Sequence, residues 1–237
     1  MRSDLPGSIG AATLTFGCAI LFSLAARPSP AESQAAHDTP SAAVTPVLTP
    51  SAEPAAWAAF KEAWANITAY RTTITIFEQK GTEVQNVVFD YNFRKPSSAT
   101  VRCVTGPSAG ITLEWSGGDT VVAHRGGLLA FFKKTHSLHD PQVVTIRGSS
   151  IDQLSFGAFL THSRGTPGTI SQAAGPTILG IPTEAVILVP TSSVTDTGLT
   201  REIVDLSKPT NLPLRVLGYD GDALVRQIDF SDVTLER

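Results

Sequence analysis

The sequence contains very little cysteine, with only Cys18 and Cys103 among 237 residues. Cys18 falls within an uncharged N-terminal run, so removal of that run would leave Cys103 alone and exclude an intramolecular disulfide. The folded part of the chain must then be held together by its apolar core. Cys103 lies in a strand-like pattern with no base beside it in sequence. We expect a buried small hydrophobic residue there, not a nucleophile.

Charge of neither sign dominates the composition. The 18 basic and 21 acidic residues give a formal net charge of −3, which leaves no basic surface of the kind that binds nucleic acid. After the N-terminal run, no hydrophobic stretch approaches the roughly 20 residues that span a bilayer. We therefore expect no nucleic-acid partner and no second membrane-spanning stretch.

The sequence also lacks the common catalytic motifs. It has no Gly-x-Ser-x-Gly elbow, and its paired glycines at 117–118 and 126–127 are typical of hairpin turns, not of a phosphate-binding loop. Its carboxylates are scattered over strand-like and turn-like segments. Because catalytic sites need convergent groups, we expect neither an enzyme nor a cofactor.

One cluster could bind a metal. His136, His139 and Asp140 are spaced so that a helix would bring them to one side. The neighbouring Lys134 and Pro141 favour a polar surface loop instead, and we expect no metal. A metal-assisted hydrolase built on these three residues remains the third functional alternative.

The N-terminus has the pattern of an export signal. Arg2 precedes an uncharged run over residues 9–26, and Ser29-Pro-Ala31 offers small residues at the −3 and −1 positions of a cleavage site. We predict an export signal over residues 1–31. An uncleaved anchor, or a lipidated N-terminus at Cys18, is the alternative.

The rest of the chain divides into two parts by composition. Residues 32–54 are rich in Ala, Ser, Thr and Pro and contain no aromatic residue, so they predict a disordered tether. Residues 55–237 predict a single domain, because a chain of this length can bury a substantial core.

Apolar residues at three- and four-residue spacing predict two helices. The first follows Pro54 and carries the stripe Trp57, Phe60, Trp64 and Ile67. The second covers residues 148–161, where Ser149 or Ser150 can cap its start.

Elsewhere the pattern alternates with a period of two, which predicts strands. They fall near residues 70–80, 89–94, 99–105, 111–115, 120–124, 128–133, 184–189, 199–206, 212–219 and 223–235. In the last strand Val233 and Leu235 are out of phase with Ile228 and Phe230, so we predict a one-residue bulge at Ser231-Asp232. The predicted fold class is α+β, with one curved antiparallel sheet of 8 to 11 strands wrapping two or three short helices.

The aromatic residues of this pattern allow two interpretations. They are Phe77, Phe89, Tyr91, Phe93, Trp115, Phe131, Phe132, Phe156 and Phe159. They could fill an ordinary core beneath the helices, or part of the concave face could stay open as a ligand cavity.

The order of short motifs resembles the LolA/LolB-like superfamily of bacterial envelope proteins. The matching segments are Phe77-Glu-Gln79, Phe93-Arg-Lys-Pro96 with Thr100-Val-Arg102, Trp115-Ser-Gly-Gly-Asp119, Asp205 to Arg215, and Asp220-Gly-Asp222 before Ile228 to Val233. The resemblance covers nearly all of residues 55–237. It implies an unclosed β-barrel whose helices form a lid over the concave face.

The resemblance also implies a function and a site. Better-known members bind acyl chains of lipoproteins, so we expect an exported, periplasmic, non-enzymatic and monomeric binding protein for lipid or lipoprotein acyl chains. The alternative is a regulatory or scaffold domain that binds a protein partner of the envelope. The expected cavity residues are Phe89, Tyr91, Phe93, Leu113, Trp115, Phe131, Phe156 and Leu160. Lys95, with Arg94 beside it, stands where the carrier has the arginine that latches its lid. Lysine lacks the planar fork of arginine.

Overall fold

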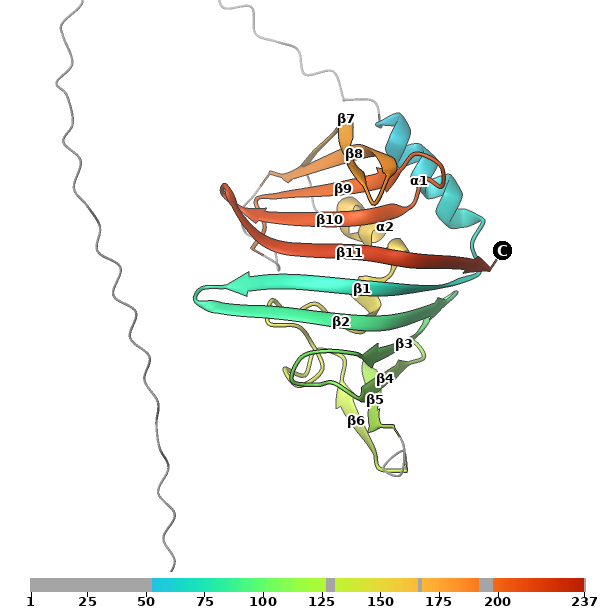
Figure 1. The fold of residues 1–237 in the computed structure, drawn as a ribbon, viewed down its shortest axis with the longest axis vertical. Helices are drawn as coiled ribbons and strands as arrows, with labels where there is room; N and C mark the ends of the chain where they lie inside the picture. The colour runs from blue at the N-terminus through green and yellow to red at the C-terminus, as the bar shows by residue number, and fades with distance from the viewer. Residues whose placement is uncertain (1–52, 127–130, 166–167, 192–197, 237) are drawn as a thin grey trace, which may run out of the picture. The chain divides into compact units, whose positions relative to one another are not determined.

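The computed structural model describes residues 53–126, 131–165, 168–191 and 198–236 (Figure 1). The predicted export signal and nearly all of the predicted tether lie outside the described residues. Within the described ranges, no helix has the length and apolar character needed to cross a membrane.

One antiparallel sheet of eleven strands dominates the domain (Figure 1). Its strands are β1 (Ala69–Lys80), β2 (Glu83–Arg94), β3 (Ser98–Cys103), β4 (Ile111–Trp115), β5 (Thr120–Arg125), β6 (Lys133–Ser137), β7 (Gly168–Ile178), β8 (Ile181–Pro190), β9 (Arg201–Ser207), β10 (Pro213–Asp220) and β11 (Ala223–Glu236). The spatial order is β6-β5-β4-β3-β2-β1-β11-β10-β9-β8-β7. The first and last strands of the domain, β1 and β11, therefore pair at its centre, while β6 and β7 form two separate edges. This confirms the unclosed antiparallel sheet that the sequence predicts.

Alternation places the apolar side chains on one side of the sheet, called here the inner face. A row of directly paired residues, each at most 5% exposed, crosses six strands on this face. The row is Val186, Val204, Val216, Ile228, Ile76 and Val87. Such cross-strand pairs fix the register, because a one-residue slip would move every member to the other face.

The predicted bulge is confirmed in β11. Asp232 has a φ of +54°, and the pairing with β1 shifts between Arg71 and Thr73. The hydroxyl of Thr72 donates a hydrogen bond to the carbonyl of Ser231 at 2.7 Å. The extra residue restores the phase of the apolar residues beyond it, as the sequence pattern requires.

The helices differ in detail from the prediction. Helix α1 (Ala55–Ala65) buries Trp57 and Phe60 but ends before Ile67. The helix predicted over residues 148–161 is two elements, the 3-10 helix η2 (Ile151–Leu154) and the α-helix α2 (Phe156–Gly165). Ser155, which is extended, separates them, and its hydroxyl accepts a hydrogen bond from the amide of Ala158 at 3.1 Å. Ser155 thus caps the start of α2 and divides the single predicted helix into two elements.

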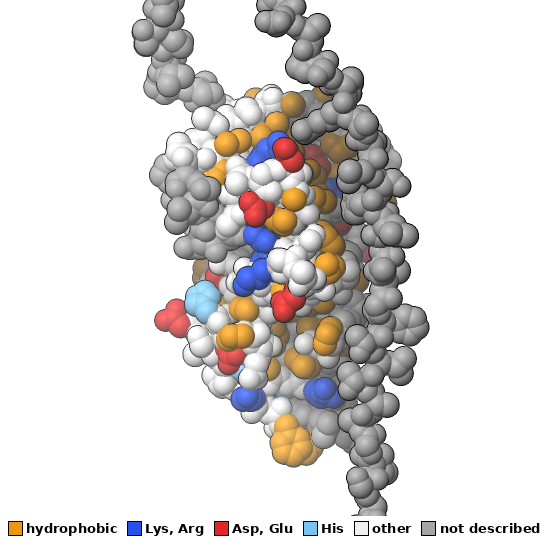
Figure 2. Space-filling view, turned by 90° about the vertical axis from the view of Figure 1, so that its left-hand side faces the viewer, with side chains coloured by type: hydrophobic (Ala, Val, Ile, Leu, Met, Phe, Trp, Pro, Cys, Tyr) orange, Lys and Arg blue, Asp and Glu red, His pale blue; other side chains and the backbone are white. Residues whose placement is uncertain are grey.

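Two strand predictions need correction. Strand β7 was not predicted, because its sequence of small and polar residues is exposed on both sides and lacks a period of two. The strand expected at residues 128–133 begins only at Lys133, and residues 127–130 lie outside the described part of the chain. On the face shown in Figure 2, acidic and basic side chains are interspersed among hydrophobic ones, without a large patch of either sign.

Candidate functional site

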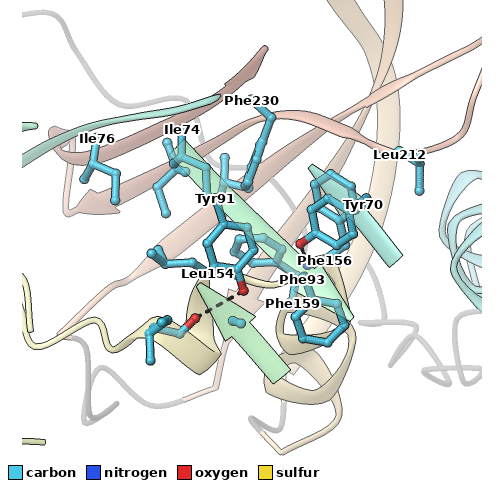
Figure 3. Packing of buried hydrophobic residues seen from close by; sticks show 14 of the residues in the cluster. Tyr70, Ile74, Ile76, Tyr91, Phe93, Leu154, Phe156, Phe159, Leu212 and Phe230 are labelled. Carbon is cyan, nitrogen blue, oxygen red and sulfur yellow. Dashed lines mark hydrogen bonds between the residues drawn. The ribbon is translucent and has the colours of Figure 1, made fainter. Parts of the chain in front are cut away.

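The inner face is filled by aromatic side chains where η2 and α2 pack against it (Figure 3). Tyr70 stacks on Phe156 with ring centroids 4.2 Å apart, and Phe230 meets Phe156 edge-on at 5.1 Å. Phe93 lies 5.7 Å from Tyr70, and Leu160 of α2 is 7% exposed. The predicted cavity residues Tyr91, Phe93, Phe156 and Leu160 therefore belong to a packed core.

Two buried tyrosines fasten the helices to this core. The hydroxyl of Tyr91 donates to the carbonyl of Ile151 at 3.2 Å, and the hydroxyl of Tyr70 accepts the amide hydrogen of Phe156 at 3.0 Å. Burial raises the pKa of both phenols well above the ordinary value, so both stay neutral. The Tyr70 hydroxyl satisfies an amide at the start of α2, where N–H groups lack partners within the helix, and the Tyr91 hydroxyl finds its own partner in η2.

A cavity of about 200 Å³ lies beyond this core, between β2–β5 and the chain above them. Inner-face residues of these four strands form its floor, together with His136 of β6 and residues 105–108. Its roof is formed by η2 and by residues 142–149. The apolar residues that line it are Val87, Phe89, Val101, Cys103, Pro107, Ile111, Leu113, Ala123, Val143, Val144, Ile151 and Leu154. Of the predicted cavity residues, only Phe89 and Leu113 are among them. Burial raises the pKa of the Cys103 thiol to about 11, so this buried cysteine stays neutral.

The roof belongs to a segment without regular secondary structure, residues 138–150, called here the covering segment. Side chains of the sheet hold it near both ends. Near its start, His136 and Lys134 of β6 bond the side chains of Asp140 and Gln142. Gln85 accepts the amide hydrogen of Ile146 at 3.0 Å. Glu78, which is fully buried, accepts the amide hydrogen of Arg147 at 3.0 Å and the hydroxyl of Ser149 at 3.2 Å. A few polar contacts near each end thus fix the covering segment to the sheet.

Glu78 begins a row of charged residues across the inner face. Along this row, Glu78 of β1 pairs with Arg226 of β11. Arg226 in turn pairs with Gly218 of β10, and Gly218 pairs with Glu202 of β9. The guanidinium of Arg226 reaches past Gly218 to form an ion pair with Glu202, and both side chains are at least 90% buried. A Cβ on Gly218 would lie 3.0 Å from Leu199 and 3.2 Å from Arg226. Glycine therefore leaves the space through which this buried pair forms.

Lys95 contacts a helix, as the resemblance implies for the latch position, but the helix is α1. Its ammonium lies 2.5 Å from the carbonyl of Trp64, 3.4 Å from that of Ala65 and 4.3 Å from the centre of the Trp64 ring. A cation at a helix C-terminus satisfies free carbonyls and interacts favourably with the helix dipole. Burial lowers the pKa of Lys95. A role for Lys95 in opening a lid stays a prediction.

Trp64 connects Lys95 to the second helix. A Cβ added to Gly157 of α2 would lie 2.7 Å from the Trp64 ring, so the two helices meet at this close contact. Arg94 points away from Lys95 and pairs with Glu236 at 2.9 Å in a solvent-exposed position. Of the two predicted latch residues, therefore, Lys95 contacts a helix and Arg94 does not.

The two predicted residues that remain lie outside both the core and the cavity lining. Trp115 is half-buried, and its indole N–H donates to the carbonyl of Gly118 at 2.9 Å. Phe131 is 72% exposed and packs against Phe132, with ring centroids 4.2 Å apart. Hydrophobic side chains protrude at the lower end of Figure 2, the end at which Figure 1 places β5 and β6.

His136 and His139 are separated by the structure. His136 is a buried residue of β6 that lines the cavity, which corrects its placement in a polar surface loop, whereas His139 is exposed. Nδ1 of His136 lies 2.9 Å from a carboxylate oxygen of Asp140. This hydrogen bond is the main cause that lowers the pKa of Asp140. Across the described ranges, no group of three His, Cys, Asp or Glu side chains is placed to hold a metal ion.

No protein-family model matches the sequence, and no curated protein is similar to it. Similar solved structures do exist. The Mycobacterium tuberculosis lipoprotein LppX is 16% identical with a TM-score of 0.46, and the match covers 78% of this chain and 94% of that one. A DUF1329 family protein from Desulfovibrio piger is 12% identical with a TM-score of 0.42, covering 77% and 92%.

A LolA superfamily protein from Nitrosomonas europaea is also among the similar structures. It is 9% identical with a TM-score of 0.38, and the match covers 77% of this chain and 94% of that one. The resemblance noted in the sequence thus agrees with the structures found. All three TM-scores lie below 0.5.

Sequence reasoning missed the roof of the cavity. Val143 and Val144 lie in a stretch without helix or strand periodicity, so no pattern marked them as lining residues. The floor was more accessible to prediction, because Val101 and Ile111 alternate with polar neighbours in predicted strands. The one sequence feature that could have indicated the roof is this pair of adjacent valines within an otherwise polar connection.

Proposed function

We propose that this chain is an exported, non-enzymatic binding protein that shelters an acyl chain of a lipid or lipoprotein. The observation that supports this most is the cavity between β2–β5 and the covering segment. Twelve apolar residues line it, and no Asp, Glu, Lys or Arg is among the described residues of its wall. Such a wall favours a ligand without charge along most of its length.

The energetics of apolar burial are sufficient for useful affinity. Each buried methylene contributes about 0.8 kcal/mol, so about eight methylenes contribute roughly 6 kcal/mol before the costs of association. The present volume of about 200 Å³ is smaller than the ~300–1,000 Å³ of typical ligand pockets. A long acyl chain therefore requires the covering segment to move outward.

The covering segment has the properties of a movable wall. It lacks regular secondary structure. Glu78 and Gln85 hold its end to the sheet, and His136 and Lys134 hold Asp140 and Gln142 near its start. The neighbouring helices, by contrast, are fixed by the stacked aromatic core. We infer that ligand entry displaces the part of the covering segment between these contacts and leaves η2 and α2 in place.

Lipid extraction of the purified full chain, followed by mass spectrometry, tests this function. We expect a lipid or fatty acid to co-purify in a ratio approaching one per protein, and an apolar dye to bind after delipidation. A protein free of lipid that also fails to bind the dye would contradict the proposal.

A second candidate is a regulatory or scaffold domain that presents a surface to a protein partner of the envelope. The exposed pair Phe131 and Phe132 favours it, because interface cores are enriched in aromatic residues. Absence of lipid, together with a crosslinked partner that is lost in the double variant Phe131→Ser, Phe132→Ser, would support this function instead.

A further inference from the structure

His136 is a polar residue in the mostly apolar wall of the cavity. It lies on the edge strand β6, pairs with Val121 and is 7% exposed. Its Nδ1 is hydrogen-bonded to Asp140, and the other carboxylate oxygen of Asp140 accepts the amide hydrogen of Gln142 at 2.9 Å. Because Asp140 is ionised and accepts the Nδ1 hydrogen, the imidazole ring is held in one orientation.

Several other polar side chains of the wall already have hydrogen-bond partners. Gln85 accepts the amide of Ile146, the hydroxyl of Thr145 accepts the amide of Ser149 at 3.0 Å, and the hydroxyl of Ser149 donates to Glu78. For Nε2 of His136, no hydrogen bond occurs within the described part of the chain. An imidazole nitrogen in a cavity wall that has no partner among the described residues is a position where a ligand oxygen can bind.

We propose that Nε2 of His136 binds the carboxyl end of a fatty acid whose hydrocarbon tail occupies the apolar cavity. This deepens the proposed function and rests on it. A single proton lies between Nε2 and the carboxyl oxygen. It can sit on Nε2, which gives an imidazolium and a carboxylate, or on the oxygen, which gives a neutral imidazole and a carboxylic acid. Either form makes one strong hydrogen bond. An ester lacks that proton and has no negative oxygen, so it binds less well.

The placement of charge around His136 suits an anionic group. Lys134 lies two residues earlier on the same strand and therefore points to the same face. Its ammonium is 3.4 Å from the side-chain oxygen of Gln142, beside Asp140. Lys134 thus supplies positive charge on the face of β6 that carries His136.

The tail of the ligand has a defined direction in this arrangement. His136 lies on the edge strand, whereas Ile151 and Leu154 belong to η2, which packs over β3 and β4. A fatty acid with its carboxyl group at His136 therefore extends inward from the sheet edge, beneath the covering segment and toward η2. Its tail then contacts Leu113 and Val101 of the floor.

The test compares decanoic acid, methyl decanoate and 1-decanol by isothermal titration calorimetry on the delipidated full chain. We expect decanoic acid to bind about tenfold or more tightly than the methyl ester. His136→Ala should remove this difference, so that the acid and the ester bind this variant with equal affinity. The matched control is His139→Ala, three residues away and exposed, which should preserve the preference for the acid.

A second readout guards against a variant that folds poorly. In the wild type, the nitrogen NMR signal of His136 Nε2 should shift on addition of decanoic acid and stay unchanged with the methyl ester. Equal affinities for acid and ester, or an equal loss of both in His136→Ala, would overturn the role of His136 while leaving acyl binding intact. Failure of all three ligands to bind would contradict the proposed function itself.

Discussion

The same type of side chain has very different surroundings at different positions in this chain. Phe156 is completely buried, stacks on Tyr70 and contacts Phe230. Phe131 is mostly exposed and touches only the ring of Phe132 among the aromatic residues. Both were predicted to line a cavity, because a sequence pattern identifies an apolar side chain but not the element that covers it.

The contrast gives a direct prediction for stability. Phe156→Ala should lower the free energy of unfolding by about 3–5 kcal/mol, because it removes a packed ring and leaves a cavity in the core. Phe131→Ala should change it by less than about 0.5 kcal/mol, as is usual for exposed side chains. Urea denaturation of both variants measures this difference, and equal losses would contradict the assignment of core and surface.

At the scale of the element, two contacts hold the parts that cover the sheet. The ammonium of Lys95 caps the C-terminus of α1, and the carboxylate of Glu78 binds the covering segment. Neither contact is visible in a hydrophobic pattern, because each depends on a residue far away in sequence. The motif resemblance did indicate Lys95, although it implied a lid helix and the structure shows α1.

Removing the cap should weaken α1 locally. Lys95→Met keeps much of the aliphatic chain but loses the charged hydrogen bond, and we expect a loss of about 1 kcal/mol in the free energy of unfolding. The control Arg94→Met removes an exposed ion pair with Glu236 and should cost less than half of that. Urea denaturation measures both. A larger effect at Arg94 would show that Lys95 does not anchor the helix.

Removing the carboxylate of Glu78 should loosen the covering segment. Glu78→Ala leaves the amide of Arg147 and the hydroxyl of Ser149 without their partner, so we expect amide exchange of Arg147 to accelerate at least tenfold. The adjacent variant Gln79→Ala is the control, since its side chain points to the other face of β1. Hydrogen exchange followed by NMR measures both rates. Unchanged exchange in Glu78→Ala would show that the segment is held by other contacts.

The elements themselves were predictable to different degrees. Strands such as β1 and β2 have one buried face, so alternation marked them, and the bulge at Asp232 followed from a break in that alternation. Strand β7 is exposed on both faces and gave no such signal. The division between η2 and α2 depends on a single serine cap, which a continuous apolar stripe conceals.

At the scale of the whole domain, the sheet has two halves with different contents. Around β1 and β11 the inner face is closed by α2 and the stacked aromatic core, whereas over β2–β5 it is hollow beneath the covering segment. The sequence predicted that aromatic residues would share one face, but not which half α2 would fill. That outcome depends on how the connection after β6 returns across the sheet, which no local pattern determines.

Titration of the delipidated protein with a fluorescent fatty acid, in the wild type and in Ala123→Phe, tests the central claim most directly. Ala123 is a small residue of β5 that lines the cavity, so a phenylalanine there would occupy it. The control Ala223→Phe places the same ring at an exposed position of β11. We expect one fatty acid per chain in the wild type and in Ala223→Phe, and at least a tenfold loss of affinity in Ala123→Phe. Equal binding by all three proteins would contradict the cavity as the binding site.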